Sequence, residues 1–453
     1  MALNAEEDSL LKRLHANLAD RPLDPVKDAD RRLYQPIHTV SDDDDPVWLM
    51  QRHIELNPVE SLQLFSGFRG SGKTTELFRL RSRLQAEDYI VLYANALTYL
   101  NPSAPVEISD LIYVLAGAFS DALDDLVGLD IERESFWARF ATFLSKADVK
   151  ITGIDAKAEI GAGGAAKVGL GIKAEFKAGS TFRQDLQKAL SGRISELKGE
   201  ADAFVEDGIK ALGEKFGPDR PIVFIFDQLE QLRGNYEAWQ SVIRSVQDVF
   251  SVHLDKLKLP YVHMIYSVPP WLSFLPALEA PITILPTMHL WNNDPDRTRF
   301  EPGWVAFRSL LERRLESDGA GRLFGPDPVR AQACIDRLIG ACGGHVRDLL
   351  RLFQDVVKRA NALPVPDRVL DSVINAARRD LLPIAREDAK VLGQIGALRD
   401  TALGQIDERS IERLSNFLDE HRVIYFVNGA AWYDIHPLIR EEVKRLNDLP
   451  PPE

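Results

Sequence analysis

The chain has 453 residues, of which 45% are hydrophobic and 27% charged, the balance of an ordinary globular protein with several domains. This balance excludes a largely disordered, collagenous or coiled-coil chain. Lys and Arg number 55 against 68 Asp and Glu, and the formal net charge of −13 argues against a broad basic face for nucleic acid. With only two cysteines and no apolar signal-peptide core at the N-terminus, we expect a cytoplasmic protein without a disulfide framework.

The first 130 residues alternate between strand and helix patterns. Residues 1 to about 60 read as a charged leader followed by a helix, and the acidic run Asp42–Asp45 before Pro46 is typical of a solvated helix start. The segment 61–66 is an apolar strand that leads through a glycine-rich turn into a helix, and 89–95 is a second strand. An amphipathic helix over 106–126 follows. This alternation predicts an α/β fold with a parallel sheet.

The segment 149–179 breaks that rhythm. Its apolar residues alternate with lysines at a period of two, and the glycines of 161–164 suit a turn, so we predict an inserted β-hairpin. Three interpretations stay open: a solvated insertion, a ribbon for oligomerisation or partner binding, and a membrane-seeking amphipathic hairpin.

The sheet is completed in the second half of the chain. We predict strands over 221–227, 261–267 and 281–290 and a helix over 235–257, followed by helices over 303–315, 327–342 and 345–360. The uncharged stretch 259–278 is as long as a membrane-spanning helix, but it contains four prolines, and Pro269-Pro270 would break such a helix at its centre. We therefore predict no membrane span.

From about residue 383 the order is helix, helix and a two-stranded hairpin around Asn428-Gly429, which is typical of a winged helix-turn-helix. The predicted fold class is thus α/β: a P-loop parallel-sheet core with an inserted β-hairpin, a helical lid and a C-terminal winged helix. The predicted domains are an N-terminal helical leader (1–60), the core (61–295), the lid (300–365) and the winged helix (380–450).

The strongest chemical signal is the segment Gly67–Thr74, GFRGSGKT, which matches G-x-x-x-x-G-K-[ST] in full between a predicted strand and a predicted helix. Glycines let the backbone curl so that successive N–H groups face the phosphates of a nucleotide, and the start of the helix adds its partial positive charge. Lys73 is expected at the β- and γ-phosphates and Thr74 at Mg²⁺. The predicted nucleotide-binding residues here are Gly67, Gly70, Ser71, Gly72, Lys73, Thr74 and Thr75, with ATP and Mg²⁺ as cofactors.

This motif resembles the P-loop NTPases, and a second motif narrows the resemblance. Four apolar residues end in Asp227, with Glu230 three positions later. The resemblance implies that Asp227 joins Thr74 as a metal ligand and that Glu230 is catalytic and orients the attacking water. Many relatives place Glu directly after the Asp, where this chain has Gln228. The D-x-x-E form is similar to the signal-transduction ATPases (STAND), and the alternative for Glu230 is a helix cap.

Two later positions resemble AAA+ proteins of the origin-recognition type. Ser267 ends a predicted strand where those proteins keep a residue that senses the γ-phosphate, with a backbone-satisfied serine as the alternative. Arg347, in the segment Gly343–Arg347, matches the lid arginine that reaches the same phosphate, with surface ion pairing as the alternative. The stretch 271–281 contains no arginine, so we predict no arginine finger there.

The C-terminal segment argues for a protein partner. From residue 381 onward it has nine Lys and Arg against 13 Asp and Glu, which disfavours DNA contact without excluding it. His436 suits a core histidine beside Trp432 and Tyr433, with nucleotide contact as the alternative. The segments GFRGSGKTTEL and WYDIHPLI together also resemble bacterial predicted ATPases of phage-defence and conflict operons.

The sequence therefore predicts an ATP-binding and ATP-hydrolysing switch whose nucleotide state controls assembly or partner binding, in the setting of anti-phage defence. The expected partners are ATP, a protein partner or effector, and further copies of the chain in a homo-oligomer. Two alternatives stay open: a DNA-binding loader that works through its winged helix, and a nucleotide-locked scaffold without turnover.

Overall fold

The computed structural model describes residues 3–38, 45–127, 139–140, 174, 186–188, 190, 192–232, 239–274, 278, 280–401, 407–428 and 430–450. The chain divides into two compact units, which we treat one at a time. We call Met50–Ser66 with Leu80–Thr283 the sheet unit, and Met1–Leu49 with Gly67–Arg79 and Ile284–Glu453 the loop unit. The hairpin predicted over 149–179 lies outside the described residues, except for Ala174, which is helical. None of the described helices is both long and apolar enough to cross a membrane.

A five-stranded sheet in the order β2-β3-β4-β1-β5 confirms the predicted α/β fold class. The pairs β1–β4, β2–β3 and β3–β4 are all parallel. Every residue of β3 is buried, because helices cover a parallel sheet on its faces, and this explains the continuous apolar run of its sequence. The strands are β1 (Ser61–Gly67), β2 (Ile90–Asn95), β3 (Ile222–Asp227), β4 (Val262–Val268) and β5 (Ile282–Leu285).

Two predicted elements are shorter than expected. The strand predicted over 281–290 ends at Leu285, because Pro286 has no N–H to donate to a sheet. Within the predicted helix 235–257, the structure has α10 (Trp239–Val252) and a separate 3₁₀ turn over Leu254–Leu257.

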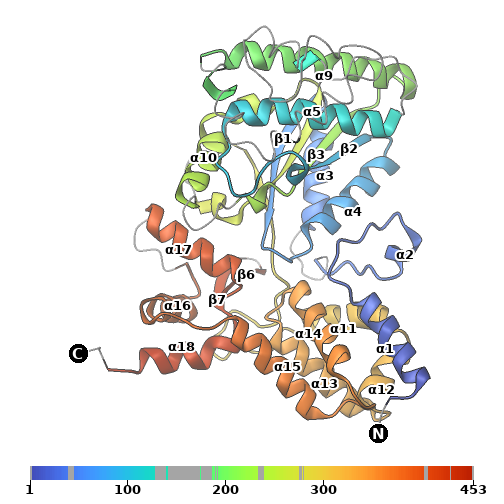
Figure 1. Cartoon of the computed structure of the whole chain (residues 1–453), viewed down its shortest axis with the longest axis vertical. Coiled ribbons are helices and arrows are strands. Elements are labelled where there is room, and N and C mark those ends of the chain that lie inside the picture. Colours follow the sequence, from blue (N-terminus) through green and yellow to red (C-terminus); the bar gives the residue numbers. More distant parts are fainter. Residues whose placement is uncertain are drawn as a thin grey trace. The chain divides into compact units, whose positions relative to one another are not determined.

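Helices of the sheet unit pack in layers on the sheet. Helix α5 (Ile108–Val127) packs on β2, and α9 (Ile194–Phe216) packs on α5 (Figure 1). Residues 108–120 of α5 are all buried, because the helix lies between the sheet and α9. Helices α3 (Pro46–Leu56) and α4 (Lys73–Ala86) flank β1 in the chain, each shared between the two units.

The acidic run before α3 is not wholly solvated where it is described. Asp45 accepts a hydrogen bond from the N–H of Val47 at 3.0 Å, as a helix cap does, and it is ion-paired with Arg79. Its side chain is only 15% exposed. The predicted helix start is present. Asp45, the last carboxylate of the acidic run, is bound by Val47 and Arg79 instead of being solvated.

The loop unit contains a helical bundle with its own core. Helix α1 packs against α11 and α14, and α13 packs against α11, α14 and α15. Leucine, phenylalanine and valine side chains of these helices form one buried cluster. The sequence prediction missed α15 and the short helix α12. The bounds are α1 (Ala5–Asn17), α2 (Asp28–Arg31), α11 (Glu301–Leu315), α12 (Gly319–Phe324), α13 (Pro328–Ala341), α14 (Val346–Arg359) and α15 (Asp367–Asp380).

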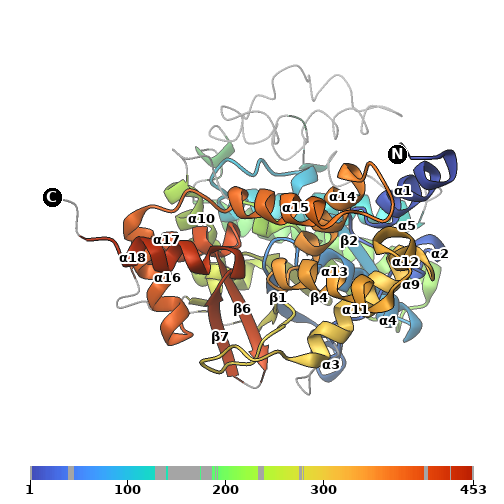
Figure 2. The ribbon, with the colours of Figure 1, turned by 90° about the horizontal axis from the view of Figure 1, so that it is seen from below.

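The C-terminal segment has two helices followed by an antiparallel hairpin, in the predicted order (Figure 2). Helix α16 packs on β7, and α17 packs on β6. A last helix, α18, was not predicted and packs on α16. The winged-helix assignment stays an interpretation of this order. The bounds are α16 (Arg386–Leu398), α17 (Glu408–Asp419), β6 (Val423–Asn428), β7 (Ala430–Ile435) and α18 (Arg440–Asn447).

One buried carboxylate fixes the hairpin within the loop unit. Asp434 is 1% exposed and receives hydrogen bonds from Arg297 Nε at 2.8 Å and from Arg440 Nη2 at 2.9 Å, with Arg399 as a third partner. Burial of an unpaired carboxylate is costly, so this arginine set specifies where β7 lies.

Candidate nucleotide-binding site

The glycine-rich loop connects β1 to α4 and adopts the backbone conformation that its glycines allow. Gly70 has φ +90° and Gly72 has φ +100°, values that side chains other than hydrogen rarely tolerate. A Cβ atom at Gly70 would also lie 2.7 Å from the Cβ of Arg347, whereas one at Gly72 would meet nothing within 4 Å. Gly72 therefore serves the loop conformation alone, and Gly70 also lets helix α14 approach the loop.

Polar groups of the loop suit a phosphate. The Ser71 hydroxyl is buried and has no hydrogen-bond partner among the described residues. Lys73 is 6% exposed, and its ammonium group donates to the carbonyl oxygens of Gly67 at 2.8 Å and Phe68 at 3.2 Å. A buried hydroxyl without a partner and a buried ammonium group, at the N-terminus of α4, are the donors that a phosphate needs.

The N-terminal segment holds the residues that follow the loop. The hydroxyl of Thr75, which we expected near the α-phosphate, accepts a hydrogen bond from the N–H of Leu23 at 3.1 Å. Tyr34 donates its hydroxyl to Glu76 at 3.1 Å, and burial raises the pKa of the Glu76 carboxyl. The half-buried Thr74 keeps its predicted role as a metal ligand without further support.

Helix α14 approaches the loop at its start. The N–H of Arg347 donates to the carbonyl oxygen of Gly70 at 3.3 Å, so the predicted phosphate-sensing arginine does lie beside the loop. Its guanidinium Nε donates to Asp20 at 2.9 Å, and Arg351 contacts the other oxygen of the same carboxylate at 2.9 Å. Asp20 therefore pairs with two arginines of α14. Arg347 is in an ion pair, as the alternative interpretation of this residue expects.

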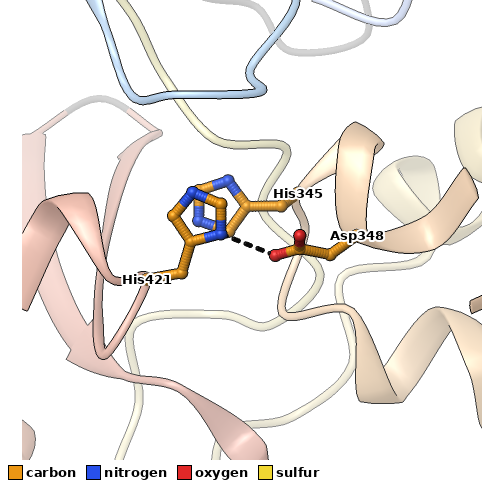
Figure 3. A group of neighbouring side chains, drawn as sticks. All are labelled: His345, Asp348 and His421. Carbon is orange, nitrogen blue, oxygen red and sulfur yellow. Dashed lines mark hydrogen bonds and ion pairs between the residues drawn. The ribbon is translucent and has the colours of Figure 1, made fainter. Parts of the chain in front are cut away.

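The C-terminal segment also contacts the loop, through two residues. Phe68 of the loop lies against Tyr425 of β6, with ring centroids 5.8 Å apart. His421, which follows α17, places Nε2 2.7 Å from the carbonyl oxygen of Arg69 and Nδ1 2.7 Å from Asp348. Figure 3 shows the ring of His345 lying over the ring of His421, at 4.0 Å between centroids and 9° between planes.

Two further histidines of this region are buried and neutral. Burial lowers the pKa of His345 well below its usual value, and burial lowers that of His436 to about 4. His436 Nδ1 accepts a hydrogen bond from the N–H of Leu438 at 3.3 Å, and a Cβ at Gly343 would lie 2.8 Å from its Nε2. His436 therefore packs under the turn before α14, as a core histidine does.

The acidic residues belong to the sheet unit. Asp227 is fully buried at the end of β3 and accepts hydrogen bonds from Tyr93 Oη at 2.9 Å and from the N–H of Gln228 at 2.8 Å. Burial, with the nearby charge of Asp227, raises the pKa of the Tyr93 hydroxyl. Gln228 has φ +74°, a strained conformation for a side chain of this size that is common at functional sites.

Ser267, in β4, bonds to the segment after β3 that carries both carboxylates. Its hydroxyl accepts a hydrogen bond from the N–H of Gln228 and donates one to Glu230 Oε2 at 2.7 Å. Glu230 lies in a 3₁₀ turn over Leu229–Gln231 rather than in a helix that it caps. Neighbouring strands thus bring Ser267 and Glu230 together. The alternative, a serine whose hydroxyl bonds to the backbone, accounts for the bond from Gln228 but not for the bond to Glu230.

Similarity to known proteins is found among solved structures alone. No family model and no curated protein matches the chain. Among solved structures it is similar to the Aeropyrum pernix ORC2 protein with ADPNP and ADP (11% identity, 88% of this chain and 92% of that one, TM-score 0.36) and with ADP (10%, 89% and 91%, 0.38). It is also similar to Cdc6p from Pyrobaculum aerophilum (12%, 88% and 92%, 0.32).

Sequence reasoning missed three residues of the site: Asp20, Tyr93 and His421. Tyr93 had a local signal, since a polar residue near the end of a strand beside β3 faces the same edge as Asp227. Asp20 and His421 had none. Each meets the loop or α14 across more than 300 residues of chain, and no periodicity or spacing records such a contact.

Proposed function

We propose that this chain is an ATP-dependent molecular switch of the AAA+ type. The observation that carries the proposal is the loop between β1 and α4, whose left-handed glycines, partnerless Ser71 hydroxyl and buried Lys73 suit a polyphosphate. The strand order, with the loop on β1 and Asp227 at the end of β3, supports the same proposal.

In this proposal each site residue has a separate role in binding or hydrolysing ATP. Lys73 and the N–H groups of the loop bind the β- and γ-phosphates. Thr74 and Asp227 would hold Mg²⁺, which would supply positive charge to offset the charge that develops on the transferred phosphoryl group. Glu230, positioned by the Ser267 hydroxyl, orients the attacking water. Arg347 exchanges Asp20 for the γ-phosphate.

We further propose that the switched partner is a protein. The groove along α16 and α17 is lined by three arginines and three carboxylates, a balance that suits a protein surface better than a polyphosphate backbone. Assembly into a homo-oligomer and a setting in anti-phage defence remain proposals from sequence resemblance. No observation on the described residues favours the DNA-loader or scaffold alternatives.

Titration calorimetry with ATP and Mg²⁺ tests the proposed binding. We expect saturable binding to the unmodified protein and a loss of about 100-fold in affinity for Lys73→Ala, since the ammonium group makes two or more charge-assisted contacts with phosphate. Lys12→Ala is the matched control, because Lys12 pairs with Asp8 on the exposed face of α1. Equal affinity of the Lys73 variant and the unmodified protein would refute the proposal.

A further inference from the structure

The ring of His421 bridges Arg69 and Asp348, and the number of protons on the ring decides whether both hydrogen bonds form. The carbonyl oxygen of Arg69 and the carboxylate of Asp348 are both acceptors, and each lies 2.7 Å from a different nitrogen of the ring. Figure 3 shows the bond between His421 and Asp348. A neutral imidazole has one N–H and makes one of these bonds, whereas the doubly protonated ring makes both. The full bridge therefore contains one proton more than a neutral histidine supplies.

A metal ion does not explain this geometry as well as a proton does. His345, Asp348 and His421 have potential ligand atoms within 4.8 Å of one another. However, the two rings are stacked face to face, so their lone pairs run in parallel planes instead of converging on one point. The distance of 2.7 Å between His421 and Asp348 is that of a direct hydrogen bond.

Other titratable and charged groups surround the ring. Although burial opposes ionisation of Asp348, the hydrogen bond and charge of His421 hold the pKa of that carboxyl below its usual range. His345 and His436 have lowered pKa values and stay neutral. The remaining charged groups that face the same cavity are Arg69 from the loop, Arg347, Arg351 and Asp355 from α14, Asp380 from α15, and Asp419 and Glu420 beside His421 itself.

The bridge reaches the parts of the loop unit that the proposed switch uses. Two successive carbonyl oxygens of the loop are held from outside, that of Arg69 by His421 and that of Gly70 by the N–H of Arg347. Asp348, the other partner of His421, directly follows Arg347 on α14. Loss of one bond of the bridge therefore loosens the loop, the start of α14 and the C-terminal hairpin together.

We infer that His421 is a positioning residue that couples protonation to nucleotide retention. With both nitrogens protonated, it fastens the C-terminal segment and α14 to the phosphate-binding loop and slows nucleotide release. When it is neutral, one bond is lost and release accelerates. This inference rests on the proposed nucleotide binding at the loop and adds its regulation by pH.

The test measures the dissociation of N-methylanthraniloyl-labelled ADP by stopped flow, with excess unlabelled ADP, at pH 6.0 and 8.5. For the unmodified protein we expect release about tenfold faster at pH 8.5, the effect of one charge-assisted hydrogen bond. His421→Gly should release fast at both pH values. Glycine suits this position because His421 has φ +58°, so truncation adds no backbone strain, and the unfolding temperature checks that the variant is folded.

A second variant tests whether slow release depends on the charge of the His421 ring or on the hydrogen bonds that the ring makes. The amide introduced by Asp348→Asn can donate to Nδ1 of a neutral ring while Nε2 donates to Arg69, so this variant should release slowly at both pH values. His15→Gln, which replaces an exposed histidine of α1, should keep the profile of the unmodified protein.

Several results would overturn the inference. One is a pH profile in His421→Gly equal to that of the unmodified protein, and another is fast release at both pH values in Asp348→Asn. Stoichiometric Zn²⁺ in the purified protein that is lost in His421→Gly would assign the ring to a metal instead. Absence of labelled-ADP binding at either pH would refute the proposed function as well, whereas binding with a flat profile refutes the inference alone.

Discussion

The acidic residues of the sheet unit and the proposed phosphate-binding residues of the loop unit are held in place in different ways. Asp227, Glu230 and Ser267 lie on or directly after neighbouring strands, and the register of the sheet fixes their hydrogen bonds. The loop instead depends on contacts from distant segments, Leu23 on one side and Arg347 and His421 on the other. A rigid set of acids can keep its geometry while the loop unit changes its contacts. We therefore expect variants of the acids to change turnover, and variants of the loop contacts to change nucleotide retention.

The largest expected effect is on turnover. Glu230→Gln should lower the rate of Mg²⁺-dependent ATP hydrolysis by 100-fold or more and leave ATP affinity unchanged, because it removes the base that orients water and no phosphate contact. Phosphate release and calorimetry on the same preparation measure the two quantities.

Glu60→Gln is the matched control for this variant, since Glu60 accepts a hydrogen bond from Tyr261 at the opposite end of the sheet. Loss of ATP affinity in Glu230→Gln would contradict the separation of the two sets. Absence of turnover in the unmodified protein under any condition would favour the scaffold alternative.

The next effect concerns the response of the loop unit to acid. In the loop unit, burial lowers the pKa of His38 and that of His436 to about 4 each. Between pH 4 and about 6.5 the unfolded chain binds more protons at these sites, so the free energy of unfolding rises with pH. Acidification from pH 7 to pH 5 should therefore lower the free energy of unfolding by about 2 kcal/mol for each of these histidines. Each such loss raises the unfolding constant about 30-fold.

Urea denaturation at the two pH values, followed by hydrogen exchange resolved along the chain, measures this loss. His38→Gln should reduce the pH dependence, and His15→Gln should leave it unchanged. Equal midpoints at pH 7 and pH 5 would show that these imidazoles do not stay neutral in the folded protein.

A smaller effect is expected from Ser267→Ala. This change removes the hydroxyl that positions Glu230 and should lower turnover about tenfold without changing ATP affinity, the size of one hydrogen bond. Ser66→Ala is the matched control, because Ser66 is an equally buried strand-end serine whose hydroxyl donates to the carbonyl oxygen of Val268. A similar loss of turnover in both variants would mean that Ser267 contributes packing only.

Sequence patterns predicted the strands and most helices well, because burial on both faces produces the apolar run of β3 and burial on one face the periodicity of α14. They also predicted a glycine-rich loop after β1 and an aspartate at the end of β3, which the structure has, while the roles of the loop, Asp227 and Arg347 in nucleotide binding stay predictions. They did not predict Asp20 or His421, whose partners are set by tertiary packing of segments far apart in the chain. They placed Thr75 near the α-phosphate, which stays a prediction, and they did not indicate that its hydroxyl accepts from the N–H of Leu23, a bond that only the folded N-terminal segment makes.

The central claim is that the nucleotide bound at the loop controls the C-terminal segment. Hydrogen–deuterium exchange of peptides from α17 to β7, with and without saturating ATP, tests it most directly. We expect exchange to slow about tenfold on ATP addition in the unmodified protein, since the loop carbonyl oxygen bound by His421 becomes fixed. Lys73→Ala should show no change. Saturated ATP binding with unchanged exchange in these peptides would contradict the account.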